Sequence, residues 1–271
     1  MSEPIISDTG PDAPTAEQRR LSFGSAAAEY AAARPGYPVD AVQWVLDGAS
    51  HAVRDVADIG AGTGALTRTL ISLAERVTAY EPDAGMLEQL HAALPGVGTA
   101  VAPAESLPTA KATLDAVLAA QAWHWFDHAA AAAEFARVLR PGGVVGLVWN
   151  VRDSRVPWMG ALQAIIGGED SMRLVATEST QTILEQEERA GLAELDVFLP
   201  GVERATFPHT IAMTPDQLVR LTSTYSYVRL SPRADELYTA VRELLATHPD
   251  TAGRDTVDVA YVTAAYRWRR P

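Results

Sequence analysis

The chain has 271 residues and no cysteine, and its 22 Lys and Arg against 34 Asp and Glu give a formal net charge of −12 at neutral pH. This length can bury a full hydrophobic core within one large domain, and the absence of cysteine excludes disulfides, thiolate zinc sites and a cysteine nucleophile. An acidic chain repels a phosphate backbone, so we expect no nucleic-acid partner.

The first twenty residues, MSEPIISDTGPDAPTAEQRR, lack the apolar stretch of a secretory signal. No run of about 18 apolar residues, the length that spans a membrane as a helix, occurs in the sequence. We therefore predict a flexible N-terminal arm over 1–20 and a cytoplasmic protein with no membrane contact.

From residue 53 to 149, short apolar runs typical of strands alternate with segments typical of helices. The strand candidates are VRDVADI, VTAY, GTAVA, LDAVLAA and VVGLVW; the helix candidates between them are TRTLISLAE, MLEQLHAAL and HAAAAAEFARVL, and RPGG is a turn. This alternation predicts a parallel sheet covered on both faces and joined by right-handed crossovers. The continuous apolar character of LDAVLAA and VVGLVW predicts central strands buried on both sides.

After this region the pattern changes. Residues 155–190 are helical and polar, and 214–246 hold two helix candidates, the first with Thr214 as N-cap and Pro215 at its first position. VERATFPHTIAM and VDVAYVTAAYRW look like two more strands, which gives a Rossmann-like, doubly wound α/β fold with a mostly parallel, seven-stranded sheet. Arg267, Arg269 and Arg270 form a basic cluster near the C-terminus. We expect this cluster to be a solvated tail.

A glycine-rich turn, VADIGAGTGA at 56–65, follows the first predicted strand, and EPDAGM at 81–86 follows the second. Glycines let the backbone approach a ligand closely, and this arrangement suits NAD, a phosphate or S-adenosylmethionine. Asp58 could accept hydrogen bonds from an ammonium group, whereas a pyrophosphate gains nothing from a nearby anion. Glu81 could accept both ribose hydroxyls in either cofactor class.

Five motifs make the resemblance specific: VADIGAGTGALTRTL, YEPDAGML, PAESLP, LDAVLAAQAWHWFD and FARVLRPGGVVGLVW. In order and spacing they resemble class I S-adenosylmethionine-dependent methyltransferases, most closely small-molecule enzymes of the methyltransferase 11 type. The resemblance is dense over about 23–150 and loose beyond. It implies a methyltransferase domain over 21–271, comprising an N-terminal helical cap at 21–50, a donor-binding core at 51–150, an inserted helical acceptor lid at 151–200 and the rest of the sheet at 201–271.

The resemblance also implies donor contacts. Those to the methionine part are Asp58, Gly60 and Gly62; Glu81 would hold the ribose; those around the adenine are Pro82, Met86, Ala104 and Glu105. Pro103 stands where many members of the family have an aspartate, which puts one adenine contact in doubt.

The stretch FGSAAAEYAAARPGYP resembles the family's N-terminal cap, in which a tyrosine and an arginine close over the donor. Arg34 can grip the donor carboxylate with two hydrogen bonds, and Tyr30, one helical turn earlier, projects from the same face. The alternative is that Arg34 only extends from a helix end before Pro35.

The stretch QAWHWFD follows the fourth strand, beside the place expected for the reacting methyl group. Gln121 is a candidate donor contact, and Trp123 or Trp125 could face the donor cation or belong to the core. His124 is the candidate catalytic base, because an unperturbed histidine pKa near 6.5 suits proton removal at neutral pH; the alternative is a structural hydrogen bond. We expect His128 to cap a helix or face solvent.

Beyond the fifth strand, Asn150 and Arg152 are expected at the same edge, near the acceptor. The asparagine-proline-proline-aromatic motif of amide N-methylation is absent after the fourth strand. Asp127 and Asp153 are the nearby acids, which is sparse for a metal-dependent catechol-type site.

We therefore expect an S-adenosylmethionine-dependent methyltransferase that acts on a small-molecule acceptor by direct in-line transfer. An NAD-dependent oxidoreductase is one alternative, but it requires a catalytic pair such as Tyr and Lys, and the chain has a single lysine, Lys111. A non-catalytic donor-binding module is the other. The acceptor, the methylated atom and the oligomeric state stay open.

Overall fold

The structure is a computed structural model that describes residues 35–167, 195, 201–229 and 231–271. The predicted arm over 1–20, the cap residues Tyr30 and Arg34, and most of the predicted lid over 151–200 lie outside these residues.

The described residues form one seven-stranded sheet in the order β3-β2-β1-β4-β5-β7-β6. Its strands are β1 (Asp55–Ile59), β2 (Arg76–Tyr80), β3 (Gly98–Ala100), β4 (Leu114–Ala120), β5 (Leu139–Arg152), β6 (Glu203–Met213) and β7 (Val257–Arg269). The pairs from β3 to β5 are parallel, and β7 runs antiparallel to both of its neighbours. The Rossmann-like, mostly parallel α/β fold is confirmed. The strand order reverses between β1 and β4, which is where such sheets bind ligands at their carboxyl ends.

The helices of the described part are α3 (Val39–Leu46), α4 (Thr67–Leu70), α5 (Ala84–Ala93), α6 (His128–Val138), α7 (Pro157–Ile166), α11 (Pro215–Ser223), α12 (Ser226–Arg229) and α13 (Ala234–Thr247), with a 3₁₀ turn η2 (Trp123–Trp125). Thr214 caps α11 and Pro215 follows at its first position, as predicted, and Thr214 also forms a reciprocal capping box with Gln217. The helix expected over 67–75 is only four residues long, and hydrogen-bonded turns follow it. Within the described residues, no helix is both long and apolar enough to cross a membrane.

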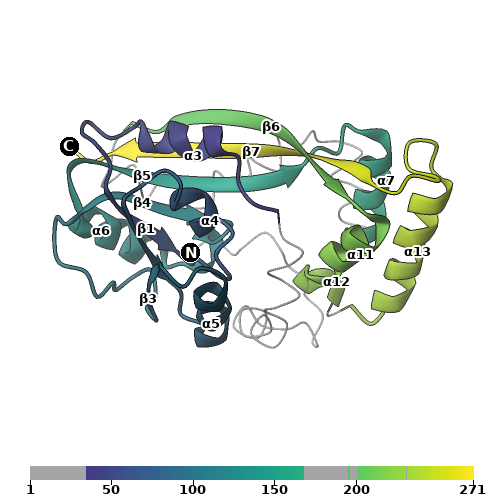
Figure 1. The fold of residues 1–271 in the computed structure, drawn as a ribbon, viewed down its shortest axis with the longest axis horizontal. Helices are drawn as coiled ribbons and strands as arrows, with labels where there is room; N and C mark the ends of the chain where they lie inside the picture. Colours follow the sequence, from purple (N-terminus) through teal and green to yellow (C-terminus); the bar gives the residue numbers. More distant parts are fainter. Residues whose placement is uncertain (1–34, 168–194, 196–200, 230) are drawn as a thin grey trace.

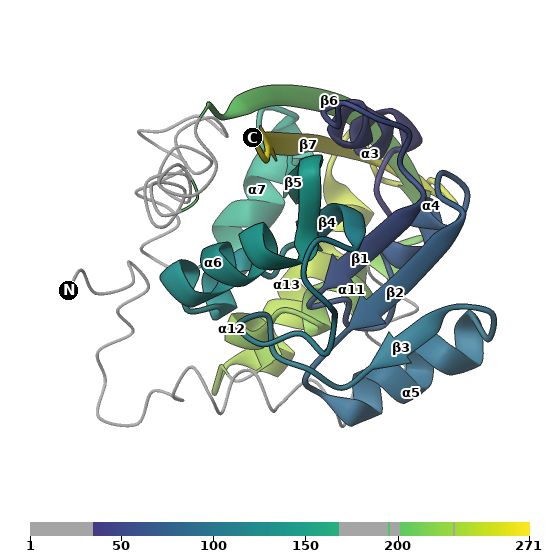
Figure 2. The same cartoon turned by 90° about the vertical axis from the view of Figure 1, so that its left-hand side faces the viewer.

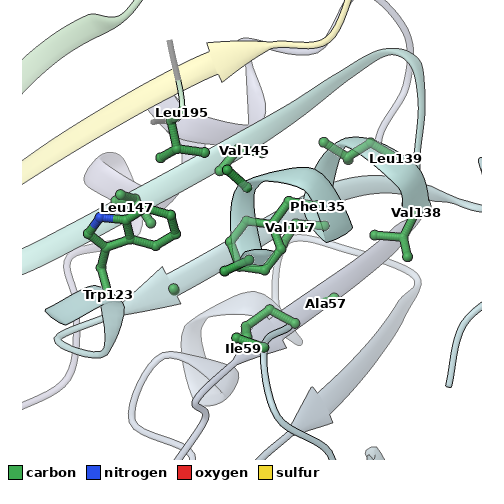
Figure 3. Packing of buried hydrophobic residues seen from close by; sticks show 14 of the residues in the cluster. Ala57, Ile59, Val117, Trp123, Phe135, Val138, Leu139, Val145, Leu147 and Leu195 are labelled. Carbon is green, nitrogen blue, oxygen red and sulfur yellow. The ribbon is translucent and has the colours of Figure 1, made fainter. Parts of the chain in front are cut away.

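Two hydrophobic clusters cover the two faces of the sheet, as Figure 2 shows for α6 on one side and α3 and α4 on the other. On the α6 face, Phe135 and Val138 pack against Val117, Val145 and their neighbours (Figure 3). On the other face, α3, the turn around α4, and α5 pack on β1, β2 and β4. All but the last residue of β4 are buried, which confirms the predicted central strand.

Strands β5, β7 and β6 are much longer than the rest and run beyond the parallel core to a second group of helices (Figure 1). There α7, α11 and α13 pack with the ends of β6 and β7 in a third hydrophobic cluster. The sequence RPGG, expected as a turn, lies within β5, where the pairing register with β4 shifts between Leu114 and Ala116 and Gly142 has a φ of +79°. It is a bulge rather than a chain reversal.

The three C-terminal arginines do not form a solvated tail, so that prediction is wrong. Arg267 lies 4.2 Å over the Trp44 ring and donates to the Trp44 carbonyl at 2.5 Å. Arg269 donates to the Gly48 carbonyl, and Arg270 to the Leu139 carbonyl. The last carbonyls of a helix attract cations, and β7 brings Arg267 and Arg269 to the end of α3.

Candidate active site

The glycine turn follows β1 and has the backbone geometry that glycine permits. Gly60, Gly62 and Gly64 have φ values of +65°, +56° and +89°. The amides of Gly60 and Ala61 both donate to the carbonyl of Tyr80, at 2.8 and 3.1 Å, which ties the turn to the end of β2. The turn is therefore fixed by left-handed backbone conformations that other residues adopt only with strain.

The glycines differ in what surrounds them. A Cβ at Gly60 would lie 2.7 Å from the Cβ of Ala122, in the loop after β4, and 3.3 Å from the Phe126 ring. Among the described residues, a Cβ at Gly62 would meet only the Met86 sulfur, at 3.9 Å. Gly60 thus allows the glycine turn to pack closely against the loop after β4. Gly62 has free space beside it within the part of the chain that the structure describes.

Asp58 is the penultimate residue of β1 and is 1% exposed. Its Oδ2 accepts a 2.6 Å hydrogen bond from the hydroxyl of Thr67, while its Oδ1 is buried and has no partner among the described residues. Burial is the main reason that its pKa is raised to about 7; the Thr67 hydroxyl opposes this rise and the charge of Glu81 adds to it. The carboxyl is therefore poised to ionise or stay protonated near neutral pH.

Asp115, one strand away on β4, shows what a purely structural buried acid looks like in this sheet. It is 3% exposed, and its oxygens accept from the amides of Arg54 and Asp55 at 2.9 Å and bond with the side chains of Arg140 and His51. Although burial opposes it, these bonds hold the pKa of Asp115 at about 2. Asp115 is saturated with donors, whereas Asp58 has a vacant acceptor, a condition typical of functional sites.

Glu81 comes directly after β2 and is 7% exposed. Its Oε2 accepts from the Gly62 amide at 2.9 Å and its Oε1 from the Asp83 amide at 3.0 Å. The register Asp58↔Ala79 places Glu81 two residues along the neighbouring strand, on the same face of the sheet as Asp58. Two fixed carboxylates thus flank the glycine turn.

The residues predicted around the adenine lie in the loops after β2 and β3 and in the first turn of α5. Pro82 is exposed, and Met86 is buried in the first turn of α5, where Asp83 caps its amide at 3.0 Å. Ala104 is buried, and Glu105 accepts from the Asp127 amide at 2.7 Å. That bond links Glu105 to the start of α6, an interaction that the sequence does not indicate.

Gln121 directly follows β4 and has a φ of +53°, which is strained for a residue other than glycine. Its amide donates to the carbonyl of Val148 at 3.0 Å, and its side-chain nitrogen donates to the carbonyl of Asn150 at 2.8 Å. The side chain of Gln121 therefore ties the end of β4 to the end of β5.

The two tryptophans of the WHW stretch separate. Trp123 is 2% exposed and belongs to the hydrophobic core (Figure 3). His128 stacks on it with ring centroids 4.9 Å apart, so it neither caps α6, which Asp127 does, nor simply faces solvent. His124 is exposed in η2, with its ring 4.8 Å from that of half-buried Trp125.

Asn150 and Arg152 lie at the carboxyl end of β5 and are both engaged by other elements. Asn150 donates to the Gly36 carbonyl at 2.9 Å and accepts from the Thr263 hydroxyl at 2.6 Å. Arg152 donates to Gln163 in α7 and lies 4.7 Å over the Tyr225 ring.

Sequence reasoning missed Thr67. A threonine at the start of a helix looks like an ordinary N-terminal residue, and its contact with Asp58 depends on how the turn closes. The sequence itself shows only a threonine nine residues after Asp58; that both side chains are buried and bonded is seen only in the structure.

The comparisons with known proteins agree on the family. Residues 57–147 match the methyltransferase domain of the methyltransferase 11 type. An uncharacterized methyltransferase from Mycobacterium tuberculosis is 42% identical over 250 residues, which cover 91% of this chain and 95% of the relative. One from Schizosaccharomyces pombe is 30% identical over 93% of this chain and 96% of its own length.

A solved structure adds the fold. A protein from Anaeromyxobacter dehalogenans, proposed to be a type II methyltransferase, is 26% identical with a TM-score of 0.62, over 87% of this chain and 97% of its own. The chain belongs to the class I methyltransferase family, of the methyltransferase 11 type.

Proposed function

We propose that this methyltransferase uses S-adenosylmethionine as its donor and transfers the methyl group to a small-molecule acceptor by direct in-line displacement. The observation that carries the proposal is the buried Oδ1 of Asp58, which has no partner among the described residues and lies beside the glycine turn that Glu81 holds.

These residues fit the donor's polar groups. An α-ammonium group would satisfy the vacant Oδ1 of Asp58 and favour its ionised form, since an opposite charge lowers the pKa of a carboxyl. Glu81, oriented by two backbone amides, can accept further bonds from ribose hydroxyls. A dinucleotide pyrophosphate at this turn would instead meet two buried carboxylates, which weighs against NAD.

The rest of the proposed donor site follows the family pattern. Gly60 and Gly62 would border the methionine part. The side-chain nitrogen of Gln121 bonds the Asn150 carbonyl, so the side-chain oxygen of Gln121 would face the donor. The proposed adenine contacts are Pro82, Met86, Ala104 and Glu105, and the proposed cap residues, outside the described part, are Tyr30 and Arg34.

The bound donor would supply a methyl group on a positively charged sulfur. The protein's own contribution is alignment, which can lower a barrier by about 7–11 kcal/mol. Trp123 is committed to the core, which leaves Trp125 as the candidate for a cation–π contact worth about 0.5–2 kcal/mol.

His124 is the proposed base for acceptors that must lose a proton. Its exposure on η2, directly after the loop that contacts Gly60, leaves it accessible to an acceptor. An acceptor that is already an anion or an activated carbon needs no base.

The proposal is tested by calorimetric titration of the full chain with S-adenosylmethionine, S-adenosylhomocysteine and NAD. Binding of the first two and not of NAD is the expected result; binding of NAD alone would overturn the donor assignment. Transfer of a labelled methyl group across a panel of small hydroxyl, amine, carboxylate and thiol acceptors then separates an enzyme from a donor-binding module.

A further inference from the structure

Thr67 begins α4 and is completely buried, nine residues beyond Asp58 in the chain. Its hydroxyl donates to Oδ2 of Asp58 at 2.6 Å, the length of a strong hydrogen bond to a carboxylate. Since Oδ2 is occupied by this bond, Oδ1 is the oxygen left for a ligand.

The surroundings of Asp58 otherwise oppose its negative charge. The carboxyl is buried, and Glu81, at the end of the neighbouring strand β2, is the titratable group whose charge acts on it. Arg68, next to Thr67 on α4, is exposed to solvent. Among the described residues, the interactions that favour the ionised form are hydrogen bonds from Thr67, through its hydroxyl and its backbone.

We propose that Thr67 is a positioning residue for the donor: its hydroxyl occupies Oδ2 of Asp58, favours the carboxylate form and turns Oδ1 toward the donor's ammonium group. This inference rests on the proposed function, because it requires that S-adenosylmethionine occupies the glycine turn. Thr67 itself contacts neither the donor nor the acceptor in this account.

The experiment compares wild type, Thr67→Val and Thr67→Ser. Valine keeps the branched shape of threonine and removes the hydroxyl, whereas serine keeps the hydroxyl and removes a methyl group. The ligands are S-adenosylhomocysteine and 5′-methylthioadenosine, which shares the adenosine and the thioether but has no amino acid part. Dissociation constants are measured by calorimetry from pH 5.5 to 8.5.

In wild type, affinity for S-adenosylhomocysteine should rise with pH as Asp58 ionises, with a midpoint near neutrality. We expect Thr67→Val to weaken this affinity about tenfold at pH 7 and to move the midpoint up by about one pH unit, since one hydrogen bond to a charged acceptor is lost. Thr67→Ser should restore both. Affinity for 5′-methylthioadenosine should be the same in all three proteins.

An unchanged affinity and pH midpoint in Thr67→Val would overturn the inference, as would an equal loss of both ligands, which would indicate a merely structural role. If Thr67→Val does not fold, Thr67→Cys, with a weak donor of similar size, replaces it under the same criteria. Failure of wild type to bind S-adenosylhomocysteine at any pH would instead contradict the proposed function.

Discussion

At the scale of single residues, Asp58 and Asp115 give two buried acids with opposite protonation behaviour. The pKa of Asp58 is raised mainly by burial, whereas backbone amides and Arg140 hold that of Asp115 down despite burial. The opposite pKa shifts of the two acids cannot be read from the sequence, because both acids lie in apolar strands of similar pattern. What separates them is the number of donors that the fold brings to each carboxyl.

Asp58→Asn should stabilise the unliganded protein in a pH-dependent way. The folded pKa of about 7 lies above the unfolded 3.8, so the folded state holds a proton that the unfolded state releases, and stability falls as pH rises between these values. The Asp58→Asn variant carries no such proton, so its stability does not fall over this pH range. Its gain in unfolding free energy over wild type should therefore be larger at pH 8 than at pH 5, by about 2–3 kcal/mol, as measured by urea denaturation.

Asp115→Asn is the matched control. The pKa of Asp115 is depressed, so its carboxylate contributes stability that is present above the unfolded pKa and lost as pH falls toward 2. The variant should lose at least about 2 kcal/mol at pH 7 and keep its donor affinity. A pH-independent effect of Asp58→Asn would show that Asp58 is not protonated near neutrality.

Alanine at Gly60 and at Gly62 should have separable effects. Both positions have positive φ, so each substitution strains the backbone by about 1–2 kcal/mol. At Gly60 the new methyl also collides with Ala122, so we expect a further loss of stability and poor folding. At Gly62 the added methyl has room among the described residues, and the main loss should be in donor affinity. Thermal unfolding and calorimetry distinguish the two; equal stability losses would contradict this account.

His124→Gln tests the proposed base. If the acceptor must lose a proton, turnover should fall about 10²–10⁴-fold with donor affinity nearly unchanged. An exposed side chain is not needed for folding, so the fold should be intact. Loss of donor affinity would place His124 in the donor site instead.

At the scale of elements, the sequence predicts best where the evidence is local. Continuous apolar runs identify β4 and the central part of β5 correctly, because burial on both faces leaves few polar positions. The C-terminal arginines are misread because their partners are distant in the sequence: Arg267 and Arg269 bond carbonyls at the end of α3, more than 200 residues away, and Arg270 bonds Leu139, 131 residues away. Likewise, the bond from Glu105 to the start of α6 and the strained backbone of Gln121 depend on how loops meet, which no local pattern encodes.

The Asn150 side chain joins β5 to two other parts of the fold. It links β5 to Thr263 in β7 and to Gly36, just before α3. Asn150→Ala should lower the free energy of unfolding by about 1–3 kcal/mol, since two side-chain bonds are lost. Thr263→Val, which removes only one of them, should lose less. Chemical denaturation measures both, and an equal or larger loss in Thr263→Val would contradict this expectation.

At the scale of the whole molecule, one sheet joins the hydrophobic core of the parallel strands to a second group of helices. Strand β7 begins in the third hydrophobic cluster, with Val257 and Val259, and ends in the core below α6, with Tyr266 and Trp268. The polar residues Gln121 and Asn150 lie between these regions, at the carboxyl ends of β4 and β5. This edge of a doubly wound sheet is where ligands bind, so the architecture and the vacant Asp58 oxygen indicate the same place.

A crystal structure of the full chain with S-adenosylhomocysteine tests the donor assignment most directly. The account predicts the ammonium nitrogen within about 3 Å of Oδ1 of Asp58, with the Thr67 hydroxyl still on Oδ2 and the ribose hydroxyls on Glu81. A ligand whose amino acid part lies away from Asp58, or whose ribose does not contact Glu81, would contradict it.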